Sequence, residues 1–99
     1  MIFHITNKGA WETSKEVGEY SGDTLQTEGF IHCSTLEQIY EVACYLFSKK
    51  EDLVILEIDE NVVIPEIKYE DAGNGKLYPH IYGSLNIDAV KNIRDFYIG

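Results

Sequence analysis

Basic residues are scarce in this sequence. The 99 residues include only 8 Lys and Arg against 17 Asp and Glu, so the formal net charge is −9. Binding to nucleic acid or to anionic lipid needs clustered Lys and Arg, and Lys49 and Lys50 form the only adjacent basic pair. We therefore expect neither nucleic acid nor a membrane among the partners of this chain.

Long apolar runs and cysteine motifs are also missing. Apolar runs such as residues 53–56 fall far short of the ~20 residues that span a bilayer. No basic segment followed by a long apolar stretch, the mark of a signal peptide, precedes the first apolar pattern. The two cysteines, Cys33 and Cys44, form no CxxC motif. Reduced thiols and a cytoplasmic location are expected.

The patterns that are present predict one domain over residues 1–99. Apolar residues make up 44% of the chain and charged residues 25%, as in ordinary globular proteins. Residues 77–83, with Pro79 and Gly83, are expected to form an irregular segment, and residues 19–27 a loop. The predicted strands are residues 2–6, 30–33, 52–59, 62–64 and 67–69, with a closing strand within 89–98. Residues 87–98 also fit a helix loosely, and that alternative stays open.

Two helices complete the prediction. The first follows Asn7 as its N-cap and ends before Gly18. The second follows a capping box, in which Ser34 and Glu37 exchange hydrogen bonds, and runs to about Ser48. The expected fold class is α+β, with a small bent or split sheet of about five or six strands and two main helices.

Three histidines stand in three different kinds of segment. His4 lies within the first predicted strand, His32 ends the second, and His80 lies in an irregular segment between Tyr78 and Tyr82. We expect the three rings to open onto one polar pocket. The structural alternative is that each ring is buried or exposed singly, with no shared hollow.

The segment from residue 28 to residue 34 combines an acid, a glycine, a histidine, a thiol and a hydroxyl ahead of a predicted helix. Unpaired N–H groups at a helix start suit a phosphate or carboxylate, and Gly29 lets a ligand approach the backbone. A capped junction between strand and helix is the structural alternative. Strand alternation points His32 and Cys33 to opposite faces, so a pocket at His32 predicts a buried, structural Cys33.

At EGFIHCS and LYPHIYG the chain resembles a family of small bacterial proteins, the domain-of-unknown-function 952 family. The resemblance covers nearly the whole length. It implies a fold similar to the ADP-ribosyltransferases, a split and bent sheet with a central cleft, and it implies no established reaction. Carried over by position, His4 matches a residue that holds the nucleotide in such transferases. His32 and Ser34 match the nicotinamide and ribose pocket, and His80 and Tyr82 stand where relatives have an acid. The remaining expected substrate contacts are Thr6, Tyr20 and Gly29.

The first functional hypothesis is therefore an enzyme acting on NAD, as substrate, or on an ADP-ribose-type nucleotide. Cleaving the nicotinamide glycosidic bond develops a cationic sugar, which needs a fixed negative group and a positioned acceptor. We expect His32, His80 and Glu28 to be catalytic, with Glu70 as a weaker candidate acid.

Three alternatives stay open. A non-catalytic module would hold an anionic metabolite in the same pocket. A metal-assisted hydrolase would use the three imidazoles, although neither HxH nor HExxH spacing is present and no metal is expected. A protein-interaction role would use the aromatic C-terminal stretch around Phe96 and Tyr97. The oligomeric state is not predicted.

Overall fold

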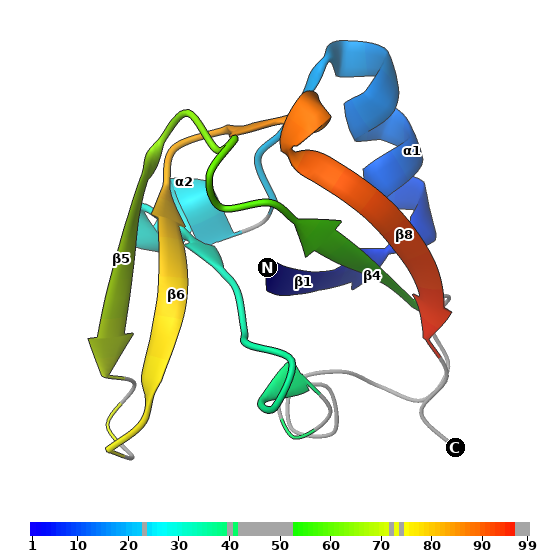
Figure 1. The fold of residues 1–99 in the computed structure, drawn as a ribbon. Coiled ribbons are helices and arrows are strands. Elements are labelled where there is room, and N and C mark those ends of the chain that lie inside the picture. The colour runs from blue at the N-terminus through cyan, green and yellow to red at the C-terminus, as the bar shows by residue number, and fades with distance from the viewer. Residues whose placement is uncertain (23, 40, 42–52, 72, 74, 97–99) are drawn as a thin grey trace.

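Two three-stranded antiparallel sheets dominate the computed structural model, which describes residues 1–22, 24–39, 41, 53–71, 73 and 75–96 (Figure 1). The first sheet has the order β1-β4-β8 and the second β3-β6-β5. The strands are β1 (Ile2–Asn7), β3 (Ile31–His32), β4 (Leu53–Ile58), β5 (Glu66–Asp71), β6 (Leu77–Tyr82) and β8 (Val90–Phe96). A short pair, β2 (Glu19–Tyr20) with β7 (Leu85–Asn86), brings the described strands to eight.

A backbone bridge joins the two larger sheets. Phe3 and Ser34 exchange two hydrogen bonds, at 2.8 and 2.7 Å, so the chain just after β3 lies alongside β1. The α+β class is therefore confirmed, but the described residues form several antiparallel sheets with eight strands rather than one sheet of about five or six. In Figure 1 the hairpin of β5 and β6 stands apart from the sheet of β1, β4 and β8.

Helix α1 (Lys8–Val17) begins and ends at the predicted residues. The side chain of Asn7 accepts a hydrogen bond from the backbone N–H of Ala10 at 2.7 Å, which caps the first turn. At the other end, Gly18 adopts a left-handed φ of 98°, and its N–H donates to the Ser14 carbonyl. Both ends are set by local chemistry that the sequence displays.

Strand β4 forms the centre of the core. Its residues are buried on both faces, apart from half-buried Glu57, as its continuous apolar run predicts. One face contributes Val54, Leu56 and Ile58 to the main cluster, and the other contributes Leu53 and Ile55 to a second cluster. The main cluster also includes Ile31, Cys33 and Ile81 of the second sheet, so the two sheets share one core.

The prediction of an irregular segment at residues 77–83 is wrong, because residues 77–82 form β6, the central strand of its sheet. The Pro79 carbonyl accepts from the Cys33 N–H at 2.9 Å. In an antiparallel pair the nitrogen of Pro79 faces the same way, toward the point where β3 ends at His32. The missing N–H of proline therefore costs one hydrogen bond only, in the pair just beyond the last residue of β3.

Two further predictions need correction. Residues 19–27 are not a continuous loop, since they contain β2 and the first four residues of α2 (Thr24–Glu28). Residues 62–64 are not a strand, because the chain turns there through the Val62 N–H bonded to the Asp59 carbonyl. A short 3₁₀ turn, η1 (Ile87–Ala89), leads into β8, the predicted closing strand.

The predicted capping box at Ser34 and Glu37 is also wrong. Ser34 is extended in its bridge to Phe3, and the turn that follows is closed by Thr35 and Gln38. The Gln38 Oε1 accepts from the Thr35 N–H at 3.0 Å. Most of the predicted second helix lies outside the described residues, as does Cys44. No helix within the described ranges is long and apolar enough to cross a bilayer.

Candidate functional site

The second sheet brings two histidines together. Antiparallel pairing of β3 with β6 sets His32 directly opposite His80, and their ring centroids lie 5.1 Å apart. Phe30, two residues before His32, lies on the same face by strand alternation. Its ring stacks on His80 at 4.2 Å and meets His32 edge-on at 4.7 Å. The rings of His32, His80 and Phe30, with Tyr82 5.2 Å from Phe30, form what we call the histidine face.

Each histidine of this face is bound to a carboxylate. The His32 Nε2 lies 3.0 Å from Glu28 Oε2, at the end of α2. The His80 Nδ1 lies 2.9 Å from Glu70 Oε1, on the neighbouring strand β5. The Tyr82 hydroxyl donates to the same Glu70 oxygen. Two imidazole–carboxylate pairs therefore stand side by side, an arrangement that orients a ring nitrogen for proton transfer.

The shared hydrogen bonds shift two pKa values. Donation from Tyr82, and then from His80, holds the pKa of the Glu70 carboxyl below its ordinary value. The same bond raises the pKa of the Tyr82 hydroxyl, because Glu70 stabilises its protonated form. At neutral pH Glu70 is thus a fixed negative charge next to His80.

Replacing Tyr82 with phenylalanine is expected to raise the pKa of Glu70, because the largest cause of its depression is lost. A depressed carboxyl pKa stabilises the fold above the unfolded-state value of about 4.3, and this stabilisation disappears as pH falls through the lower folded value. The Tyr82→Phe variant should therefore show a weaker loss of stability on acidification. Carbon NMR titration of the Glu70 carboxyl checks the direction, and an unchanged or lower pKa would contradict it.

The two histidines differ in access. The His32 side chain is 41% exposed, whereas that of His80 is 7% exposed and lies beneath Phe30. Lys68, paired across the strands with His80, holds its ammonium 4.9 Å from the centre of the Tyr82 ring. A ligand that approaches this face therefore contacts His32 first. His80, paired with Glu70, lies beneath the Phe30 ring and is less accessible to it.

His4 reaches His32 through the backbone. Its Nδ1 lies 2.5 Å from the His32 carbonyl oxygen, and its Nε2 lies 2.7 Å from the Tyr20 hydroxyl. Because a carbonyl can only accept, Nδ1 carries the proton, and in the neutral ring Nε2 accepts from Tyr20. The predicted three-ring pocket is therefore only partly formed by these contacts. His32 and His80 meet through their rings, whereas His4 binds the edge of β3.

The other predicted site residues lie around these contacts. Thr6 and Ser34 are buried, and the backbone of Ser34 bridges the sheets. Gly29 has a left-handed φ of 87° and turns the chain from α2 into β3. Cys33 is 3% exposed in the main core, and burial raises the pKa of its thiol, so the prediction of a structural thiol is confirmed.

Sequence reasoning missed Phe30 and Lys68 and gave Glu70 too little weight. The signal for the last two was the alternation within residues 66–71, which places Glu66, Lys68 and Glu70 on one side of a strand. That alternation alone did not indicate a partner for Glu70, because residues 77–82, which form the neighbouring strand β6, were expected to be irregular.

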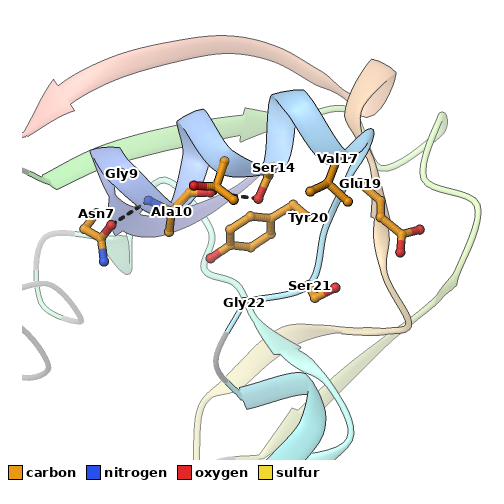
Figure 2. Close-up of a pocket in the computed structure, with 10 residues that line it drawn as sticks. Asn7, Gly9, Ala10, Ser14, Val17, Glu19, Tyr20, Ser21 and Gly22 are labelled. Carbon is orange, nitrogen blue, oxygen red and sulfur yellow. Dashed lines mark hydrogen bonds between the residues drawn. The ribbon is translucent and has the colours of Figure 1, made fainter.

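A separate hollow of about 450 Å³ lies beside α1 (Figure 2). We call it the α1 groove. Figure 2 shows Asn7 and Gly9 at one end, Glu19 and Val17 at the other, and the Tyr20 ring between them. Tyr20 thus borders the groove with its ring while its hydroxyl binds His4. Among the residues that the structure describes, no group of three or more His, Cys, Asp or Glu side chains is arranged to hold a metal ion.

Comparisons with known proteins identify a family and a relative of known structure. The sequence profile of a protein family of unknown function, DUF952, matches residues 5–93. A crystal structure of protein CC0527 from Caulobacter crescentus is 28% identical, with a TM-score of 0.91, and the match covers 99% of this chain and 87% of that one. A solution NMR structure of CC0527 matches with a TM-score of 0.84 and covers 85% of that chain. No curated protein sequence matches.

Proposed function

The chain belongs to the DUF952 family, and we propose that it is an enzyme acting on NAD or another ADP-ribose-type nucleotide at the histidine face. The observation that carries the proposal is the pairing of Glu28 with His32 and of Glu70 with His80, with the two rings 5.1 Å apart. Such an arrangement combines a proton acceptor with fixed negative charge, which are the two things that glycosidic cleavage of NAD needs.

The proposal includes an ADP-ribosyltransferase type of sheet. It is supported by the split between the β1-β4-β8 and β3-β6-β5 sheets, which are joined by the bridge from Phe3 to Ser34. Further support is that the two motifs that carry the resemblance, EGFIHCS and LYPHIYG, contribute His32 and His80 to the paired strands β3 and β6.

In the proposed reaction the bond between nicotinamide and the ribose C1′ breaks, and nicotinamide leaves as a neutral molecule with the bonding electron pair. The cationic sugar left behind is stabilised by the Glu70 carboxylate, whose depressed pKa keeps it ionised. Water or another hydroxyl then attacks C1′. Its proton passes to the His32 nitrogen that does not bind Glu28, and from there to solvent.

Titration with NAD and with ADP-ribose, followed by the histidine ring signals in NMR, tests the proposal. We expect the His32 and His80 signals to shift and saturate at or below about 1 mM, the usual upper range of enzyme KM values. Nicotinamide release, followed by chromatography in the presence of a chelator, reports turnover. Saturable binding without release would favour the binding-module alternative, and release abolished by the chelator would favour the metal-assisted one. The absence of any ring shift would refute the proposal.

A further inference from the structure

One basic side chain lies beside the histidine face. Lys68 is the only Lys or Arg within strands β3, β5 and β6, and its side chain is 50% exposed. The register pairs it with His80, so the two side chains lie on the same side of the sheet, away from the core residue Ile81. The Lys68 ammonium lies 4.9 Å from the centre of the Tyr82 ring, a distance at which a cation is attracted to an aromatic ring. A positive charge is therefore held at the edge of the proposed reaction site.

The ammonium of Lys68 has hydrogen-bonding capacity left for a ligand. Its ion-pair partner is Glu66, at 3.9 Å, which exceeds the length of a hydrogen bond. Both side chains of this pair are exposed, and an exposed pair holds its members together only weakly. Lys68 makes no hydrogen bond to any residue that the structure describes, so its three N–H donors can turn to a ligand.

The charges around Lys68 favour one class of ligand group. Three carboxylates, those of Glu28, Glu66 and Glu70, are paired with His32, Lys68 and His80, in a chain whose formal net charge is −9. An anionic ligand is repelled by these carboxylates unless its own charge lies against a cation. A lysine ammonium is a compact point charge and a common binder of phosphate. Lys68 is therefore the place on this sheet where the phosphate of a nucleotide meets an opposite charge.

The sheet places Lys68 at a suitable distance from His32. On the central strand, His80 pairs with His32 on one side and with Lys68 on the other. Neighbouring strands lie about 4.8 Å apart, so the backbones of His32 and Lys68 are about 10 Å apart. In a nicotinamide nucleotide the first phosphate is attached to the C5′ oxygen of the ribose that reacts. A ribose placed at His32 and Glu70, as the proposed reaction requires, therefore has this phosphate within reach of the long Lys68 side chain.

We propose that Lys68 binds the phosphate nearest the reacting ribose and so selects nucleotides over nucleosides. The inference rests on the proposed function, because it assigns a second part of the same substrate. Lys68 does not contact the bond that breaks, and its contact with the phosphate is the same before and during the reaction. Its loss is therefore expected to raise KM and to leave kcat unchanged.

Two ligands that differ by this phosphate test the inference. Nicotinamide mononucleotide carries it, and nicotinamide riboside has the same reacting bond without it. In NMR titrations of the wild-type protein, the mononucleotide is expected to bind about tenfold more tightly, the share of a charge-assisted hydrogen bond. Lys68→Gln is expected to remove this advantage and to leave the affinity for the riboside unchanged. Steady-state nicotinamide release from the mononucleotide is expected to show the same loss in KM, with kcat preserved.

A matched variant and a simpler ligand serve as controls. Lys91 is exposed on β8, in the other large sheet, so Lys91→Gln changes the net charge equally and leaves the histidine face intact. It is expected to leave both affinities unchanged. Inorganic pyrophosphate, a probe without a nucleoside, is expected to shift the backbone amides of Lys68 and Tyr82 in the wild-type protein and not in Lys68→Gln.

The outcomes separate this inference from the proposed function. The inference is overturned if the mononucleotide and the riboside bind equally tightly, if Lys68→Gln and Lys91→Gln have equal effects, or if no phosphate-bearing ligand shifts the Lys68 amide. The proposed function alone fails if pyrophosphate shifts the Lys68 amide while neither nicotinamide ligand shifts the ring signals of His32 and His80.

Discussion

Replacing His32 with alanine is expected to lower kcat/KM for nicotinamide release by about 10²–10⁴-fold, the usual contribution of a positioned acid or base. His32 is the accessible histidine of the face, and Glu28 fixes the orientation of its ring. Removing the ring leaves the reaction without its proton acceptor. Steady-state rates of nicotinamide release, measured for the variant and for the wild-type protein, check the prediction.

Added imidazole separates a chemical role of His32 from a structural one. The vacated position in His32→Ala is open to solvent, so free imidazole is expected to restore part of the rate. The matched variant His80→Ala removes a ring that is 7% exposed and stacked under Phe30, and little rescue is expected there. Wild-type rates in His32→Ala, or equal rescue of both variants, would contradict the assigned roles.

Replacing Leu56 with alanine is expected to lower the free energy of unfolding by about 2–5 kcal/mol. Leu56 lies in the middle of β4, is fully buried and belongs to the main core cluster. Truncation to alanine removes buried apolar surface and leaves a cavity. The neighbouring strands are close-packed and hydrogen-bonded, so they cannot shift to fill it. Urea unfolding followed by circular dichroism measures the change.

The cross-strand partner of Leu56 provides the control. Ile93 on β8 pairs with Leu56 and is 39% exposed. Its replacement by alanine removes a side chain of similar volume from a site already in contact with water, and a loss of only about 1 kcal/mol is expected. A loss equal to that of Leu56→Ala would show that burial at β4 does not set the stability.

The elements that local chemistry specifies could be predicted well. Asn7 and Gly18 mark the ends of α1 because an N-cap acceptor and a left-handed C-terminal residue are requirements of any helix. The burial of Cys33 opposite the exposed side of His32 follows from the two-residue period of a strand. The continuous apolar run of β4 indicated a strand covered on both faces.

The sequence named several residues of the candidate site, but it did not predict how they are arranged. His32, His80 and Glu28 were expected to act together, and their rings and carboxylate do lie in contact. The role of Glu70 depends on the register between β5 and β6, which places it near His80 and Tyr82. The pairing of β5 with β6 was not predicted, because Pro79 argued against a central strand at residues 77–82.

The sequence by itself determined the ends of α1, the burial of β4 and the acidic, cation-poor composition, because each depends on residues close together in the chain or on composition alone. Only the tertiary structure decided that His80 faces His32 across 48 residues and that His4 binds the edge of β3. Those contacts join segments far apart in the chain. The packing of the shared core selects them, and no local pattern encodes which strand will lie beside which.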